Sequence, residues 1–283
     1  MVPPLQGTSN NCLRRDRKQL LEVPFTNPAD AVHRNYALTM TIFICGHDTH
    51  IGHIRPQNED CYLINAELRL GVLADGMGGH ECGEVASQIV VEQIQSEVRS
   101  GTPMAEALVK AHHAVLAAVR DGKGRSGMGS TALAVRIDGD RFEVVWVGDS
   151  RAYLWRHGAL TQITRDHSLV QLMVDQGDIT AQEAEFHPQR NFITQAIGME
   201  SLSRLEVGLV RGHLYPGQQI LLCSDGLSGE LSADEITHIL SQQADEQAKV
   251  DQLIQMALNN GGSDNVTVLL VSAPQSEDRS DTE

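Results

Sequence analysis

Three short apolar runs follow one another closely in the middle of the chain, at residues 131–137, 142–147 and 151–155. The first two are separated by residues 138–140, Asp-Gly-Asp, a composition typical of a tight hairpin turn. Connections this short cannot carry a crossover helix, so the strands that they join must run antiparallel. The spacing therefore predicts an antiparallel sheet and argues against the regular strand–helix alternation of a doubly wound parallel fold.

The remaining elements follow from apolar runs and helical spacing. Further strands are expected at 61–64, 68–74, 220–223 and 266–271. Helices are expected at 83–98, 103–120, 168–176, 233–243 and 246–259. Antiparallel strands in the middle of the molecule with helices packed outside them predict an α+β fold, a central antiparallel β-sandwich flanked on both sides by helices.

Composition separates a central block from two tails. No long linker or internal repeat interrupts residues 41–273, so we expect one domain there. Residues 1–40 are slightly basic and rich in Asn, Pro and Arg, which predicts a disordered extension. A biological start at Met40 and a docking arm for an acidic partner are the alternatives. Residues 274–283 are acidic and contain no apolar residue, so we expect a second disordered tail.

Charge and cysteine content exclude several classes of protein. The net charge of −15 argues against binding to a nucleic-acid backbone, which needs a basic face. It leaves room for a phosphorylated substrate, because bound divalent cations supply positive charge locally. No run approaches the roughly 18–20 apolar residues of a membrane span, so no membrane insertion is expected. The five cysteines form no CxxC pair, and the N-terminus lacks the apolar core of a secretory signal, which favours a cytoplasmic location.

Aspartates stand at the ends of four apolar runs. Asp75, Asp149 and Asp225 follow such runs, and Asp264 comes just before the run at 266–271. In an antiparallel sheet the end of one strand lies beside the start of its neighbour, so these carboxylates can gather at one edge. Converging carboxylates repel unless cations intervene, and hard oxygen ligands suit Mg²⁺ or Mn²⁺. The alternative for any single Asp-Gly pair is an ordinary turn.

An arginine precedes a further acidic pair in the segment IGHIRPQNEDCYLI. Arg55 lies five residues before Asp60, and Glu59 and Asp60 begin an expected strand. Arginine holds phosphate oxygens in a planar fork, so Arg55 is a candidate substrate clamp. The alternative is a surface cluster of salt bridges.

Seven motifs occur in a characteristic order across residues 45–272. They are RPQNED, VLADGMGGH with ECGEVAS, GMGSTALAV, VGDSRAYLW, ITRDHS, LLCSDGL and GGSDNVTVLLV. Together they resemble the bacterial branch of the PP2C-type (PPM family) metal-dependent protein phosphatases. The resemblance implies a four-layer α-β-β-α sandwich with two Mn²⁺ or Mg²⁺ ions, and a weaker third, at one edge.

The resemblance also implies a role for each matching residue around the metal ions. Asp75 matches the carboxylate that bridges both ions, and Gly76 matches a backbone carbonyl ligand. Asp225 and Asp264 match ligands of the first ion. Asp60 matches an acidic residue that holds the site directly or through water.

Three positions extend this implied site. Glu59 matches a supporting neighbour, and Asp149 matches a residue that, together with Asp225, holds the third ion. Arg55 matches the arginine that binds the phosphate. With Arg55, the four aspartates Asp60, Asp75, Asp225 and Asp264 make up the expected catalytic set.

The resemblance implies a protein serine/threonine phosphatase in which metal-activated water attacks phosphoserine or phosphothreonine. Its partners would be phosphorylated proteins and a cognate bacterial Ser/Thr kinase, and it would act as a monomer. One role in the family is to oppose the kinase that regulates type VI secretion.

Met77 stands where eukaryotic relatives carry a histidine proposed as general acid, so the resemblance leaves the proton donor unassigned. A metal-bound water and His80 are the candidates. No protein nucleophile is needed, so Cys61 and Cys223 are expected to be structural. The alternatives are a metal-dependent phosphatase of a small metabolite and a catalytically silent phosphoprotein-binding module.

Three other features of the sequence lie outside this implied metal site. Segment 164–198 is irregular and charged, and in the resembled family it forms a flap beside the cleft, so we expect it to be mobile. His47, His50 and His53 have helical spacing in a stretch expected to be extended, which argues against a zinc site. The glycine-rich loop after Ser126 lacks the lysine of a phosphate-binding P-loop and reads as a turn into a strand.

Overall fold

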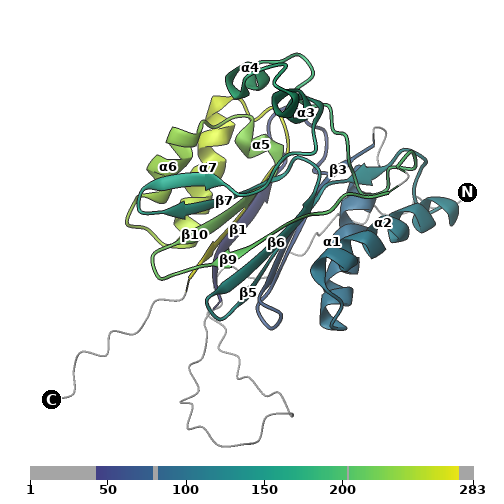
Figure 1. Cartoon of the computed structure of the whole chain (residues 1–283), viewed down its shortest axis with the longest axis horizontal. Coiled ribbons are helices and arrows are strands. Elements are labelled where there is room, and N and C mark those ends of the chain that lie inside the picture. Colours follow the sequence, from purple (N-terminus) through teal and green to yellow (C-terminus); the bar gives the residue numbers. More distant parts are fainter. Residues whose placement is uncertain (1–42, 79–81, 203, 274–283) are drawn as a thin grey trace, which may run out of the picture.

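Two antiparallel sheets form the centre of the computed structural model, which describes residues 43–78, 82–202 and 204–273 (Figure 1). The first sheet has the order β1 (Ile44–His50), β11 (Val266–Ser272), β10 (Gln219–Cys223), β7 (Arg151–Arg156) and β8 (Ala159–Gln162). The second has the order β2 (Asp60–Asn65), β3 (Leu70–Met77), β5 (Ala132–Asp138), β6 (Arg141–Val147) and β9 (Gly208–His213), and the short β4 (Gly129–Ser130) pairs with β3 beside it. Every pairing between these strands is antiparallel. The short connection between β5 and β6 gives the expected pairing, whereas β6 and β7 do not pair, because residues 148–150 carry the chain from the second sheet to the first.

The inner faces of the two sheets pack against each other through alternating apolar side chains. Leu73, Val135 and Val144 of one sheet share a buried cluster with Leu222 and Leu269 of the other. Because side chains alternate across a strand, the opposite faces remain free to pack against helices. The alternation of side chains along each strand thus gives every sheet one face for the other sheet and one face for the helices.

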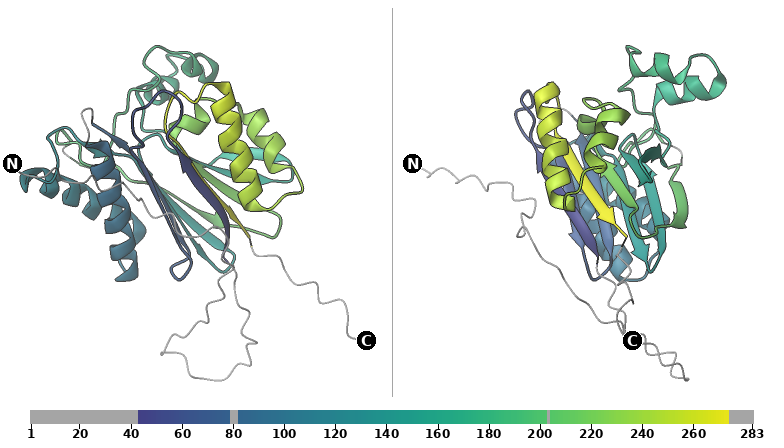
Figure 2. Two further views of the ribbon diagram at one scale, coloured as in Figure 1. Left: turned by 180° about the vertical axis from the view of Figure 1, so that it is seen from behind. Right: turned by 90° about the vertical axis from the view of Figure 1, so that its left-hand side faces the viewer.

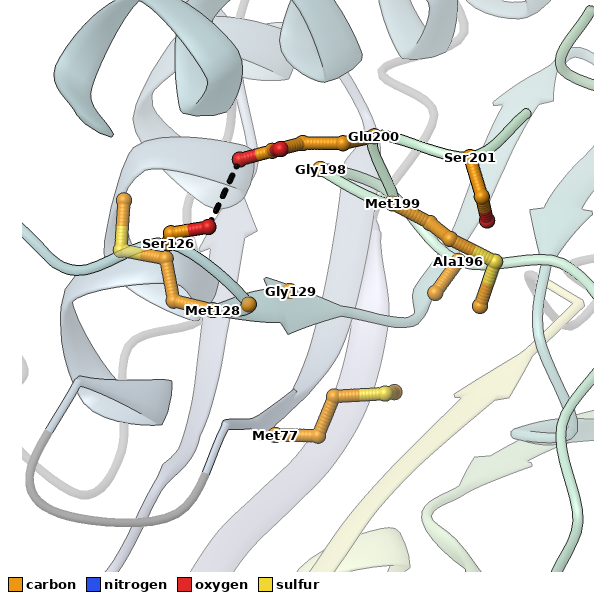
Figure 3. Close-up of a pocket in the computed structure, with 10 residues that line it drawn as sticks. Met77, Ser126, Met128, Gly129, Ala196, Gly198, Met199, Glu200 and Ser201 are labelled. Atoms are coloured by element: carbon orange, nitrogen blue, oxygen red, sulfur yellow. Dashed lines mark hydrogen bonds between the residues drawn. The ribbon is translucent and has the colours of Figure 1, made fainter. Parts of the chain in front are cut away.

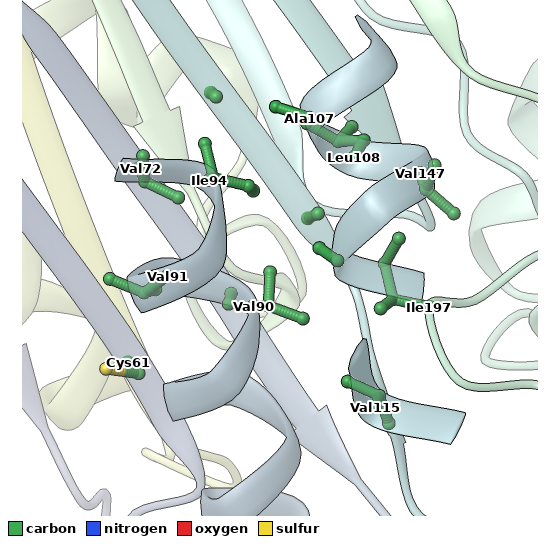
Figure 4. Close-up of a cluster of buried hydrophobic side chains, with 14 of the residues drawn as sticks. Cys61, Val72, Val90, Val91, Ile94, Ala107, Leu108, Val115, Val147 and Ile197 are labelled. Carbon is green, nitrogen blue, oxygen red and sulfur yellow. The ribbon is translucent and has the colours of Figure 1, made fainter. Parts of the chain in front are cut away.

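Helices cover the outer face of each sheet. α1 (Gly83–Arg99) and α2 (Met104–Arg120) pack on the second sheet, while α5 (Asp225–Ser228), α6 (Ala233–Leu240) and α7 (Glu246–Asn260) pack on the first (Figure 2). Their buried faces form two further apolar clusters with those sheets, one of which is shown in Figure 4. This arrangement confirms the expected α+β sandwich with helices on both sides.

The expected hairpin at residues 138–140 is present. Asp138 pairs with Arg141, which leaves Gly139 and Asp140 as the loop between β5 and β6. Gly139 has φ 63°, a left-handed conformation that glycine adopts without a steric penalty. The Asp-Gly-Asp sequence thus fixes both the turn and the register of β5 against β6.

Segment 164–198 forms a lobe at the top of Figure 1, with helices α3 (Leu169–Gln176) and α4 (Ala181–Glu185). Its ends are anchored, because Ser168 bridges to Ile193 and Ile197 bridges to Ser130. Its middle is loosely packed, with Phe186 83% exposed. The expected weak packing is therefore found in the middle of the segment, and its mobility stays a prediction.

Some expectations fall on residues that are not described. The expected disordered segments 1–40 and 274–283 lie outside the described residues, as does His80. Within the described part of the chain, no helix is long and apolar enough to cross a bilayer.

Candidate metal centre

Strand pairing brings the five expected aspartates to one end of the sandwich. Asp60 of β2 lies directly opposite Asp75 of β3, so their side chains share one face of that sheet. In the other sheet β10 pairs with both β7 and β11, so Asp149 before β7, Asp225 after β10 and Asp264 before β11 lie at a common edge. Burial raises the pKa of Asp75, and the charges of the other four carboxylates raise it further, as their common position at this end of the sandwich predicts.

Hydrogen bonds to β4 and its neighbours fix the backbone around Asp75. The Asp75 N–H donates to Thr131 Oγ1 at 2.9 Å, and the Thr131 N–H donates to the Asp75 carbonyl at 2.8 Å. Ser130 Oγ donates to the same carbonyl at 3.0 Å. A Cβ on Gly76 would lie 2.2 Å from the Gly83 carbonyl oxygen, so only glycine fits there. The strand end that carries the expected bridging carboxylate is thus held on both sides.

Asp60 is a buried carboxylate with one unsatisfied oxygen. The residue is 4% exposed, and its Oδ2 accepts a 2.6 Å hydrogen bond from Thr267 Oγ1. Its Oδ1 is buried with no hydrogen-bond partner. Burial raises the pKa of Asp60 to about 7, and the charges of Asp225 and Asp264 add to this effect. A buried carboxylate oxygen without a partner is destabilising unless a proton or a cation meets it.

Burial and mutual repulsion also raise the pKa values of the neighbouring aspartates. Burial raises the pKa of Asp75 well above its ordinary value. Burial followed by the charge of Asp225 raises the pKa of Asp149 to about 7. For Asp225, burial and then the charge of Asp264 raise the pKa to about 6. These carboxylates lose their mutual repulsion when cations bind between them.

The chemistry of this donor set fits Mg²⁺ or Mn²⁺. Both ions prefer carboxylate and carbonyl oxygens, and the partnerless Asp60 Oδ1 adds an oxygen that needs a positive partner. Among the described residues, no group of three or more His, Cys, Asp or Glu side chains is already spaced to hold an ion. The fit therefore depends on the identity, burial and crowding of the oxygens, and binding would draw the carboxylates together.

Arg55 lies at the solvent-exposed edge of the cluster. Its Nη2 donates to Asp264 Oδ2 at 2.6 Å, with side chains 49% and 29% exposed respectively. The hydrogen bond to Asp264 raises the pKa of Arg55, and the charges of Asp264, Asp225 and Asp75 act in the same direction. The guanidinium is therefore charged, accessible to solvent and adjacent to the expected metal ligands.

Sequence reasoning missed Asn265, which connects the two halves of the site. Its Oδ1 accepts from the Glu59 N–H at 2.8 Å, and its Nδ2 donates to the carbonyls of Ile51 and Gln57 at 2.9 and 3.0 Å. The Glu59 carbonyl in turn accepts from the Gly76 N–H at 3.2 Å. Glu59 thus acts through its backbone as a support, and Asn265 holds the Arg55 loop against the start of β11. The signal that was available is the Asp-Asn pair in GGSDNVTVLLV.

A cleft of about 860 Å³ opens beside the carboxylates. Asp149, Asp225 and Asp264 line one part of it, and the lobe that carries α3 and α4 lines another, including Phe186. Arg151 also lines the cleft, with Nε and Nη2 donating to Asp166 Oδ2 at 2.9 and 2.7 Å. The expected metal centre is therefore reached through an open groove rather than through a closed cavity.

The other singled-out residues lie outside this chemistry. His47 Nδ1 is 3.2 Å from the Tyr62 hydroxyl, and His50 Nδ1 accepts from the Gly52 N–H at 2.9 Å, so these rings already have partners. Cys223 is fully buried, and burial raises its pKa to about 12, which keeps it a thiol. Cys61 is buried among apolar side chains.

Comparison with known proteins identifies relatives over most of the chain. PstP of Mycobacterium tuberculosis, a serine/threonine protein phosphatase, is 42% identical over 226 residues, which are 77% of this chain and 43% of PstP. The chain therefore spans less than half the length of this relative. Protein phosphatase PhpP of Streptococcus pneumoniae is 34% identical over 235 residues, which are 79% of this chain and 95% of PhpP.

Solved structures of relatives have the same fold. The M. tuberculosis PstP structure has a TM-score of 0.75 at 37% identity, covering 82% of this chain and 99% of that one. The PstP catalytic domain has also been solved with two manganese ions, and it has a TM-score of 0.73 at 36% identity, covering 82% of this chain and 99% of that one. PppA of Pseudomonas aeruginosa, described as a key regulatory component of the type VI secretion system, has a TM-score of 0.70 at 33% identity, covering 82% and 97%.

The family model named Protein phosphatase 2C matches residues 52–266. This range contains Arg55 and all five aspartates. Members of this family use Mn²⁺ or Mg²⁺, which agrees with the oxygen-rich, crowded donor set described above. The chain belongs to the protein phosphatase 2C family.

Proposed function

We propose that this protein is a metal-dependent serine/threonine phosphatase that hydrolyses phosphoserine and phosphothreonine in other proteins. The observation that carries the proposal is the crowding of five aspartates, one of which, Asp60, has a partnerless Oδ1, beside a charged arginine and an open cleft. So acidic a site repels a phosphate unless cations are bound in it. Cations and a phosphorylated ligand are therefore expected to bind together.

The roles of the metal-holding residues are part of this proposal. Asp75 would hold both ions through its carboxylate, Gly76 would add its carbonyl as a ligand, and Asp225 and Asp264 would hold the first ion. Asp60 would hold it directly or through water. When bound, the ions supply an activated water and neutralise charge on the phosphoryl oxygens.

Two further residues would complete the site. Asp149 lies beside Asp225, which the electrostatic effect of Asp225 on the Asp149 pKa supports, and it would hold a weaker third ion. Arg55 now pairs with Asp264, and a phosphate dianion at the site would compete for its guanidinium. Its planar fork would then orient the phosphoryl group.

The shape of the cleft favours a protein substrate over a small metabolite. The groove runs from Asp149, Asp225 and Asp264 to the exposed α3–α4 lobe, which leaves space for residues of a polypeptide beyond the phosphorylated one. Phosphorylated proteins and a cognate Ser/Thr kinase are the proposed partners, with the protein acting as a monomer in the cytoplasm. The likeness to PppA supports a place in the control of type VI secretion.

Hydrolysis of a phosphothreonine peptide and of p-nitrophenyl phosphate tests the proposal. We expect turnover with Mn²⁺ that is lost in EDTA and in the Asp225→Ala variant. Turnover of a small phosphorylated metabolite far exceeding that of any peptide would favour the metabolite phosphatase instead. Binding of phosphopeptides without turnover, in folded and metal-loaded protein, would favour the silent binding module.

A further inference from the structure

A second, smaller pocket lies beside β3, between two segments that the proposed reaction does not use. It measures about 280 Å³ and is lined by residues 126–129 on one side and by residues from 196 to 201 on the other. Figure 3 shows the side chains of Met77 and Met199 approaching the same space, with Ala196 beside them. Ser126 Oγ donates to Glu200 Oε1 at 3.1 Å across the rim. The interior is thus apolar and the rim polar.

The pocket has a fixed relation to the expected metal ligands. Asp75 and Met77 are two residues apart on β3, so their side chains leave the same face of the strand, about 7 Å apart along it. Met77 pairs with Gly129 and Gly76 with Ser130, which ties the pocket wall to the strand that carries Asp75. A ligand at the metal centre can therefore reach the pocket over the length of two extended residues.

The lining chemistry suits one apolar side chain. Methionine thioethers are flexible and polarisable, and they adapt to aliphatic partners of different shape. The volume lies below the roughly 300–1,000 Å³ typical of pockets that enclose a whole small molecule. A side chain of the size of leucine or methionine is therefore a better match than a cofactor.

We propose that this pocket is a specificity subsite that binds an apolar side chain of the phosphoprotein, two residues from the phosphoserine or phosphothreonine. An extended peptide advances about 3.3–3.4 Å per residue and turns alternate side chains to the same face. With its phosphorylated residue at the aspartates, the side chain two positions away reaches Met77 and Met199. This inference depends on the proposed protein phosphatase activity and names the substrates that it selects.

The test is a set of phosphothreonine peptides in which leucine, phenylalanine or serine is placed in turn at each position from three before to three after the phosphothreonine. We expect kcat/KM to be at least about ten-fold higher for leucine than for serine at one position two residues away, as loss of apolar contact in a pocket predicts. Each ratio is measured within one variant, so that a general change in activity cancels.

Two substitutions of Met199 and one control decide whether the pocket causes the preference. Met199→Glu places a carboxylate in the pocket and should abolish the leucine-to-serine ratio. Met199→Ala enlarges the pocket and should shift the preference toward phenylalanine. Met256→Ala removes a half-buried methionine that packs on the far sheet and should keep the ratio of the parent protein.

The outcomes separate this inference from the proposed activity. No preference at any position, or a leucine preference that survives in both Met199 variants, would overturn the subsite while leaving the phosphatase intact. Turnover of p-nitrophenyl phosphate with no turnover of any peptide would overturn the protein phosphatase and the subsite with it.

Discussion

The aspartates of the metal centre oppose one another in the folded chain. The pKa of Asp225 is raised to about 6 by burial and by Asp264, so replacing it removes an unfavourable buried charge. We expect Asp225→Ala to lower kcat by more than about 100-fold, since loss of a group that merely orients a metal ligand already costs 10–100-fold. The same variant should be at least as stable as the parent in EDTA.

The matched control for that substitution is Asp251→Ala, which removes an exposed carboxylate from α7. It should leave both kcat and the unfolding temperature near the values of the parent. Near-parental turnover in Asp225→Ala, with steady-state kinetics measured under saturating Mn²⁺, would show that Asp225 does not hold an ion. Circular dichroism of both variants separates loss of activity from loss of fold.

Arg55 is expected to act in binding rather than in the chemical step. Its guanidinium is half exposed and bound to Asp264 alone among the acidic side chains of the described residues, so a phosphate can displace that contact. We expect Arg55→Ala to raise KM for a phosphopeptide by roughly ten-fold or more and to change kcat less, because a charge-assisted fork to phosphate is lost. Arg211→Ala, at the exposed pair with Glu143, is the control. An unchanged KM would show that Arg55 does not bind the phosphate group.

The sequence singled out the charged residues that the structure brings together, but it missed the neutral residues that contact them. Asp60 and Asp75 stand out because each adjoins an apolar run, and this junction is visible locally. Asn265 and Thr267 contact residues more than 200 positions away, and no local pattern marks such long-range hydrogen bonds. Supporting residues of this kind can be recognised only once the packing of β2 against β11 across the two sheets is known.

At the scale of elements, the buried strands were predictable, whereas the edge strands β8 and β9 were not. β5 and β6 are continuous apolar runs joined by a recognisable turn, and they form where expected. β8 is mostly exposed and short, and β9 contains Gly208 and Gly212, where a Cβ would meet the rings of Trp146 and Phe142. Close contact with these rings, rather than strand propensity, therefore accounts for the two glycines of β9.

The α3–α4 lobe is expected to open locally more often than the sandwich. Its middle has Phe186 and Phe192 exposed at 83% and 59%, and α4 buries no residue, so little apolar contact opposes opening. We expect backbone amides of α4 to exchange with solvent at least about 100-fold faster than those of β6 in hydrogen-exchange mass spectrometry. Protection of α4 equal to that of β6 would contradict a mobile lobe. The Thr180 capping box, which closes the start of α4, was the available sequence signal for this helix.

At the scale of the whole molecule, the raised pKa values make stability depend on pH when no metal is bound. The pKa values of Asp60 and Asp149 are about 7 and that of Asp225 about 6, against 3.8 for an unperturbed aspartate. At pH values between the pKa of an unperturbed aspartate and the pKa values in the folded chain, the folded chain holds more protons than the unfolded chain. The free energy of unfolding therefore falls as the pH rises through the pKa values of the folded state. The stabilisation is complete below about pH 4 and is lost by about pH 8.

In EDTA we therefore expect the free energy of unfolding to fall by roughly 2–4 kcal/mol between pH 5.5 and 8, which is about 5–10 °C in Tm. Mn²⁺ should reverse this trend, because the ions bind deprotonated carboxylates and their affinity rises with pH. Thermal unfolding across this pH range, with and without Mn²⁺, measures both effects, and Asp225→Asn should flatten the slope in EDTA. A metal-free protein whose Tm rises from pH 5.5 to 8 would show that the aspartates are not crowded as the structure has them. In that case, the buried carboxylates would not link metal binding to the stability of the fold.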